Sequence, residues 1–148
     1  MNITRLTEYD LPSLAELFTQ FWGEVSSIEK MKSSFAKISN SPTYILLAAK
    51  QNEKLIGFAM GIICRELYGD CKPFMVIEDL IVHKNQRRSK VGSGLMRELE
   101  KIAIENDCCQ VIFVTEAKRT EGCRFYKSLG YEFEPHRGFK RKLETANK

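Results

Sequence analysis

The chain has 148 residues, with 23 lysines and arginines against 19 aspartates and glutamates, so its formal net charge is +4. This length is typical of one ordinary domain, and a hydrophobic content of 43% is enough for a core. No window holds the roughly 18 uninterrupted apolar residues of a membrane helix, and the N-terminus has no apolar signal-peptide region. We expect a single domain over residues 1–148 that has no membrane contact and resides in the cytoplasm.

Cysteine and histidine usage argues against a metal centre. Cysteines are odd in number and the only two histidines lie far apart, so neither a disulfide framework nor the usual zinc-ligand spacing is present. The residues concerned are Cys64, Cys71, Cys108, Cys109, Cys123, His83 and His136. We expect reduced, mostly structural thiols and no metal ligands.

Hydrophobic periodicity predicts the first elements in chain order. Residues 2–6 form a short strand, Asp10 can cap a helix with a 3.6-residue apolar stripe, and a weaker helix covers residues 28–38. Residues 44–49 and 55–64 form an antiparallel hairpin. In the second of these strands Gly57, Ala59 and Gly61 alternate with larger residues, so that one face of the sheet admits a close neighbour.

The second half of the chain predicts a strand over 74–82, a helix from Val91 and a strand over 110–115. A short helix that Thr120 can cap ends at Gly130, and strands follow over 131–133 and 138–143. This order predicts an α+β fold with a central mixed, mostly antiparallel, twisted sheet of six to seven strands and about four flanking helices. Neither a dinucleotide-binding fingerprint nor a P-loop is present.

Two adjacent carboxylates, Glu78 and Asp79, lie in the middle of the apolar strand over 74–82. Strand alternation predicts that Glu78 shares a face with Leu80, and Asp79 with Ile81. A carboxylate is costly to bury unless it is paired or used, and apolar neighbours raise its pKa toward the range of a general base. A structural ion pair is the alternative for either residue.

A basic turn follows this strand. Lys84, Arg87, Arg88 and Lys90 fall within seven residues that contain no acid, and glycines begin the next helix. The free N–H groups of a helix N-terminus, together with local positive charge, favour a phosphate or pyrophosphate. Nucleic acid is disfavoured as a partner because only this one short patch is basic and no aromatic platform is interleaved with it.

These features, followed by the run Phe125-Tyr-Lys-Ser-Leu-Gly-Tyr131, resemble the GNAT superfamily of acetyl-CoA-dependent N-acetyltransferases. The family pattern of Arg or Gln, two residues, Gly, one residue, Gly or Ala falls on Arg87, Lys90 and Gly92, with Lys90 where a glycine is usual. A lysine does not have a glycine's freedom at positive φ. Arg119 stands where relatives often have an asparagine.

The resemblance implies acetyl-CoA as co-substrate and direct transfer in a ternary complex. It implies that Tyr126 protonates the leaving thiolate and that Glu78 acts as base through water. Backbone N–H groups near Leu80 to Val82 can stabilise the oxyanion if a bulge leaves them unpaired. The implied cofactor-binding residues are Leu80, Ile81, Val82, Arg87, Arg88, Ser89, Lys90, Val91, Gly92, Ser93, Gly94, Arg119 and Tyr126.

The acceptor is predicted to be a primary amine of a small cationic molecule, because acidic side chains beside an aromatic suit a cation. The residues with this character are Trp22, Glu24, Glu29 and Asp79, with Glu66 and Asp70 in the same class. A protein or peptide amine is the alternative acceptor, and a non-catalytic acyl-CoA-binding regulatory module is the alternative function. A homodimer is possible for such a fold.

Overall fold

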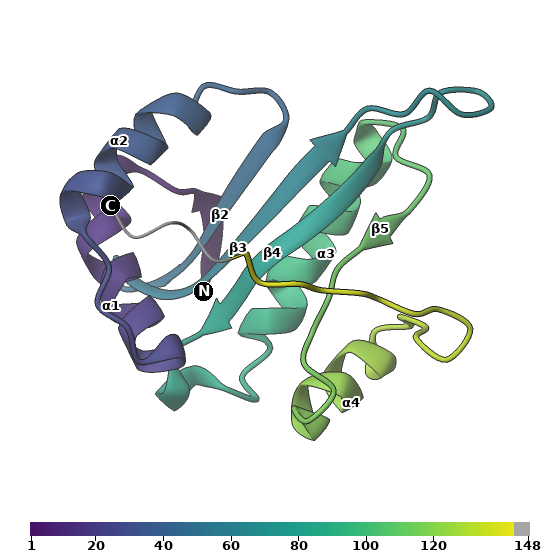
Figure 1. Ribbon diagram of the computed structural model, residues 1–148. Coiled ribbons are helices and arrows are strands. Elements are labelled where there is room, and N and C mark those ends of the chain that lie inside the picture. The colour runs from purple at the N-terminus through teal and green to yellow at the C-terminus, as the bar shows by residue number, and fades with distance from the viewer. Residues whose placement is uncertain (144–148) are drawn as a thin grey trace. The chain divides into compact units, whose positions relative to one another are not determined.

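The computed structural model describes residues 1–143 (Figure 1). Its internal contacts divide the chain into two compact units, Met1–Phe113 and Val114–Lys148. Among the described residues, no helix combines the length and the apolar character needed to cross a bilayer.

The first unit is built on one sheet whose strands lie side by side in chain order. The first four strands pair antiparallel and the fifth pairs parallel to the fourth, which confirms the predicted mixed, mostly antiparallel sheet. The strands are β1 (Asn2–Arg5), β2 (Tyr44–Gln51), β3 (Lys54–Cys64), β4 (Phe74–Val82) and β5 (Val111–Ile112).

Helices cover both faces of this sheet (Figure 1). On one face, the apolar side of α1 packs with Leu46, Phe58 and Ile81, and residues of α2 pack against the same cluster. The opposite face is covered by α3. The helices of this unit are α1 (Leu11–Trp22), α2 (Ile28–Ile38) and α3 (Val91–Glu105), with short 3-10 turns η1 (Glu8–Asp10) and η2 (Lys84–Gln86).

The glycines of β3 explain how closely α3 approaches the sheet. A Cβ at Gly57 would lie 2.8 Å from Val91 Cγ1, and a Cβ at Gly61 would lie 2.9 Å from Leu99 Cδ2. Both distances are too short for real carbon atoms. The predicted small-residue face of this strand is therefore confirmed, and its neighbour is α3.

The number of strands was overestimated. Residues 1–143 contain five strands, not six to seven, and the strand predicted over 110–115 is reduced to Val111–Ile112. The second unit contains α4 (Thr120–Ser128), whereas residues 131–133 and 138–143 form no strand. Strands need a partner to satisfy their backbone groups. A two-residue edge strand offers little to pair with, and the basic sequence Phe139-Lys-Arg-Lys-Leu143 has few apolar positions for a buried face.

Asp10 does not cap α1 in the predicted way. Its side chain makes no bond to the first turn of α1. Instead, the Asp10 carboxylate accepts hydrogen bonds from the Thr7 N–H (2.8 Å) and hydroxyl (2.9 Å), and it pairs with Lys50 Nζ at 2.7 Å. Burial alone would raise the pKa of Asp10, but the bonds to Lys50 and Thr7 hold it below its usual value of 3.8. This buried pair fastens the start of α1 to β2.

We predict that Asp10→Asn lowers the free energy of unfolding at pH 7 by about 2 kcal/mol, because Lys50 loses its partner in a mostly buried position. A folded-state pKa below 3.8 means that the wild-type contribution is present above that pH and is lost as pH falls through the lowered pKa. Urea unfolding at several pH values measures the difference, which should shrink below about pH 4. Glu8→Gln, in the same turn but exposed, is the control and should change stability little.

Candidate active site

The central feature of the site is a β-bulge in β4. Met60 of β3 pairs with Glu78 and Phe58 pairs with Ile81, so two residues of β4, Asp79 and Leu80, stand opposite Ala59 alone. Asp79 has a φ of +59°, a left-handed conformation that aspartate tolerates better than most residues. A bulge leaves its extra residue outside the hydrogen-bonded ladder. The bulge on which the oxyanion hypothesis depended is therefore present.

The bulge also corrects the predicted faces of the strand. Directly paired residues share a face, so Glu78 lies on the α1 and α2 face with Met60, and Ile81 lies on that same face with Phe58. Glu78 thus shares its face with Ile81 rather than with Leu80, and Asp79 does not share the face of Ile81. The extra residue shifts the alternation by one position, which simple period-2 counting does not anticipate.

The two carboxylates have different environments. Glu78 is exposed, whereas Asp79 is half-buried. Burial raises the pKa of Asp79, and the neighbouring Glu78 charge raises it further. A pKa shift caused by burial and a like charge is typical of functional carboxylates. It falls on Asp79, the residue that the sequence predicted for substrate binding.

The basic turn leaves the sheet directly after the bulge. The His83 N–H donates to the Ile56 carbonyl (2.8 Å), and the Asn85 N–H donates to His83 Nδ1 at 3.2 Å. The residues that lead from there into α3 are exposed, namely Arg87, Arg88, Ser89 and Lys90. Val91 is buried in the core, while Gly92, Ser93 and Gly94 are half-buried in the first turn of this helix.

Lys90 is the N-cap residue of α3 and has a φ of +66° and a ψ of +9°. The lysine therefore adopts the left-handed conformation that a glycine would accept without strain. Arg88 has a similar φ of +63°. Cationic residues, left-handed backbone and a helix N-terminus together make a cradle suited to phosphate oxygens. The residues of this turn fit a pyrophosphate-containing co-substrate.

The C-terminal end of α1 reaches the same turn. Gln20 Oε1 accepts a hydrogen bond from the Lys84 N–H at 2.9 Å. Trp22 and Glu24, predicted to bind substrate, follow within four residues, and the Glu24 carbonyl accepts from the Thr19 hydroxyl. Glu29 lies in the first turn of α2. The structure therefore brings the end of α1 and the turn after β4 together.

Glu66 and Asp70 are not brought to this place. They belong to the connection between β3 and β4, which joins Cys64 to Phe74 at the far end of β4 from the basic turn. The Glu66 carboxylate accepts from the N–H groups of Leu67 and Tyr68 within its own loop. This part of the acceptor hypothesis has no support from the geometry.

Tyr126 and Arg119 belong to the second unit. Tyr126 lies in α4 against the rings of Phe125 and Tyr131, with ring centroids 5.1 and 6.5 Å away. Burial raises the pKa of the Tyr126 hydroxyl, although the Arg119 charge opposes the shift. The hydroxyl therefore stays protonated at neutral pH and is able to donate. Arg119 is the N-cap residue of α4, and Thr120, the predicted cap, is the first residue of the helix.

Sequence reasoning missed Gln20, which carries no motif and lies on an exposed side of α1. It also missed the left-handed residues Asp79 and Arg88. An aspartate inside an apolar strand was a signal for a bulge, since aspartate favours this conformation. Nothing in the sequence indicated that Gln20 meets a turn 64 positions away.

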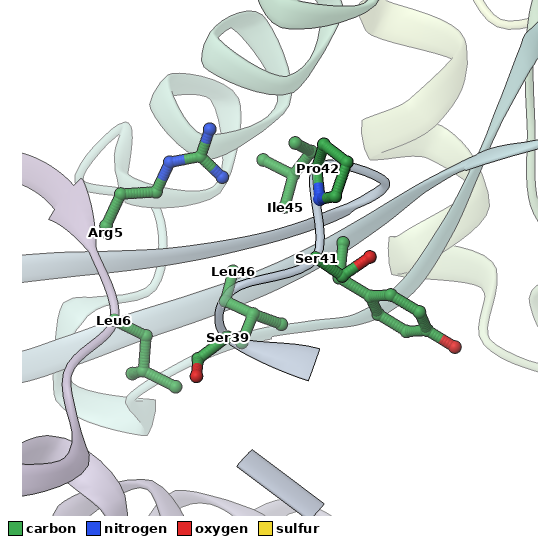
Figure 2. Close-up of a pocket in the computed structure, with 8 residues that line it drawn as sticks. Arg5, Leu6, Ser39, Ser41, Pro42, Ile45 and Leu46 are labelled. Carbon is green, nitrogen blue, oxygen red and sulfur yellow. The ribbon is translucent and has the colours of Figure 1, made fainter. Parts of the chain in front are cut away.

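A hollow of about 210 Å³ lies near the β1 edge of the sheet, where β1 ends and β2 begins (Figure 2). Arg5 and Ser39 line it, but they point to opposite sides in Figure 2. Its polar groups do not converge on one point, so we assign it no role in the reaction.

Comparison with known proteins shows the family of this chain. Residues 11–131 match the model of the Acetyltransferase (GNAT) family. A glucosamine 6-phosphate N-acetyltransferase from Candida albicans is 32% identical over 133 residues, which cover 86% of this chain and 85% of the relative. The chain that contains this bulged strand, basic turn and helix N-terminus thus matches a class of proteins that transfer acyl groups.

Solved structures show the same fold. A glucosamine-6-phosphate N-acetyltransferase from Arabidopsis thaliana matches with a TM-score of 0.78 at 18% identity, over 99% of this chain and 97% of that one. An aminoglycoside acetyltransferase from an uncultured soil metagenomic sample matches with a TM-score of 0.79 at 23% identity, over 97% and 96%. The chain belongs to the GNAT acetyltransferase family, and it is an acyltransferase.

We predict that Lys90→Gly raises the free energy of unfolding by about 1 kcal/mol, because glycine adopts the left-handed conformation without the penalty that a side chain incurs. Chemical denaturation measures this gain. Lys84→Gly is the matched control: it removes a lysine from the same turn at a residue without positive φ, so it should not stabilise the protein. An equal response of the two variants would contradict the strain argument.

Proposed function

We propose that this protein transfers the acetyl group of acetyl-CoA to a primary amine of a small cationic molecule, by direct attack in a ternary complex. The observation that carries the proposal is the bulge in β4 with its two carboxylates, followed immediately by the basic turn at the N-terminus of α3. Carboxylates favour an ammonium group and the turn favours phosphates. One short segment therefore supplies groups for both substrates.

A small-molecule amine as the acceptor is supported by the name of a relative. The Candida albicans protein is named for acetylation of glucosamine 6-phosphate, which is a small-molecule amine. The exposed Trp22 and Glu24 near the basic turn suit a small ammonium group. A protein or peptide amine is the second candidate acceptor.

In the proposed reaction the amine must first lose its ammonium proton. Glu78 is exposed, so water reaches its carboxylate, and we assign it the removal of this proton through water. Asp79 is half-buried and does not share the face of Glu78, so we assign it the attraction of the ammonium group by charge rather than direct contact beside Glu78. The amine lone pair then forms a bond to the thioester carbonyl carbon.

The developing oxyanion needs hydrogen-bond donors that are already oriented. We assign this role to backbone N–H groups of Leu80–Val82, of which Leu80 lies in the bulge itself, whereas Ile81 and Val82 pair with Phe58 and Gly57. When the carbon–sulfur bond breaks, the thiolate takes a proton, which we assign to the Tyr126 hydroxyl. The attacking nitrogen loses its second proton to solvent water, and Tyr126 regains a proton from solvent. The products are an N-acetylated amine and coenzyme A.

The function is tested by following thiol release from acetyl-CoA in the presence of a panel of amines. The panel contains glucosamine 6-phosphate, an aminoglycoside, a polyamine and a lysine-containing peptide. Turnover with a small amine and none with the peptide is expected. Turnover with the peptide alone would move the assignment to protein amines, and calorimetry showing no binding of coenzyme A would overturn the proposal.

Tyr126→Phe is predicted to lower kcat about a hundredfold, since general acid catalysis contributes at least that much, while the KM for acetyl-CoA changes little. The raised pKa of Tyr126 means that the wild-type hydroxyl is protonated across the neutral range. Tyr131→Phe is the matched control because its ring contacts Tyr126 within the same unit. An undiminished kcat in Tyr126→Phe would remove this residue from the acid role.

The variants Glu78→Gln and Asp79→Asn distinguish the roles of the two carboxylates. Asparagine tolerates positive φ, so Asp79→Asn should leave the backbone of the bulge unchanged. We expect Glu78→Gln to remove the acidic limb of the kcat profile against pH, because the base must be deprotonated to act. Asp79→Asn should keep that limb and raise the KM for the amine. If instead the limb disappears in Asp79→Asn, Asp79 is the base.

A further inference from the structure

Gln20 joins two parts of the first unit that are far apart in the sequence. It lies two residues before the end of α1. Its side-chain oxygen accepts a hydrogen bond from the N–H of Lys84 at 2.9 Å, and its nitrogen lies 3.4 Å from Nε2 of His83. Both partners belong to the start of the basic turn. A helix that covers the sheet thus holds the loop that follows β4.

The bond to Lys84 is the one that fastens the turn. The Asn85 N–H donates to His83 Nδ1 at 3.2 Å, which requires a lone pair there and leaves the hydrogen of a neutral imidazole on Nε2. The Gln20 nitrogen also carries only hydrogens, so it cannot bond to Nε2 in that tautomer. The imidazole can satisfy one of these two contacts, whereas the Lys84 bond does not depend on the tautomer.

The turn is in need of such an anchor. Four cationic residues, Lys84, Arg87, Arg88 and Lys90, follow one another without an acid between them, and like charges repel. Two of them, Arg88 and Lys90, also have left-handed backbone, which is unfavourable for residues with a side chain. Both effects favour opening of the turn when no anion is bound.

A glutamine suits this position chemically. Its oxygen satisfies the Lys84 N–H without adding negative charge, so the positive potential of the turn is kept for phosphate. A carboxylate at the same place would accept the same bond but would cancel part of that potential. The anchor therefore fixes the backbone and leaves the electrostatic attraction intact.

We propose that Gln20 is a positioning residue for the pyrophosphate part of the co-substrate: it holds the turn over Lys84–Lys90 ready for binding from the end of α1. The inference rests on the proposed function, since it assumes that this turn binds coenzyme A. It adds a residue outside the motif that carries the family resemblance. Gln20 acts through the turn and needs no contact with the ligand.

The test compares Gln20→Met with Glu16→Met, one turn earlier on the same helix and also exposed. Calorimetric titration with coenzyme A should give a Kd raised about fivefold in Gln20→Met, the effect of one lost hydrogen bond, and an unchanged Kd in Glu16→Met. In steady-state assays with an amine found by the panel above, the KM for acetyl-CoA should rise by the same factor while kcat and the KM for the amine stay constant.

The results that overturn the inference are distinct from failure of the proposed function. An unchanged Kd in Gln20→Met overturns the inference alone, as does an equal loss in kcat and both KM values, which would indicate general destabilisation. A similar effect of Glu16→Met overturns it too. Absence of coenzyme A binding to the wild-type protein overturns the proposed function, and the inference with it.

Discussion

The arrangement of the site depends on one extra residue in β4. Without the bulge, Glu78 and Asp79 would simply alternate along a regular strand, and the ladder between β4 and β3 would run without interruption from Phe74 to Val82. With the bulge, Asp79 and Leu80 stand together opposite Ala59, and the alternation after them is shifted. The shift keeps Ile81 in the core beneath α1 while Glu78 remains exposed on the same face. The bulge thus allows Ile81 to stay in the core and Glu78 to stay accessible to solvent.

The turn after β4 shows how strained backbone is held by its surroundings. Lys90 and Arg88 adopt positive φ although neither is a glycine, and the charges around them repel. Three attachments hold the loop: the His83 N–H on β3, Gln20 on α1, and the start of α3, whose Val91 is buried against the sheet. A side chain at Lys90 costs stability but places another cation beside the helix N-terminus. This balance suits a loop that binds phosphate.

Close packing of α3 on β3 sets where that helix begins. Gly57 and Gly61 leave no space for a Cβ between the strand and Val91 or Leu99, so α3 lies deep against the sheet. Val82 pairs with Gly57 at the end of β4, which places the first turn of α3 beside the strand that carries the carboxylates. The two carboxylates, which we assign to the amine, and the basic turn, which we assign to the phosphates, are therefore neighbours in the first unit.

Apolar periodicity and turn residues are local signals, so they were enough to predict α1 to α3, the hairpin of β2 and β3, the mixed sheet and the two candidate carboxylates. The family resemblance stated on Arg87, Gly92 and the Phe125–Tyr131 run was likewise readable from the chain. Other features became visible only in the folded chain: Asp10 pairs with Lys50 instead of capping α1, β4 is bulged, Gln20 bonds to Lys84, and residues 131–143 form no strand. Each of these depends on partners distant in sequence, and a pattern within one segment cannot specify which partner is present.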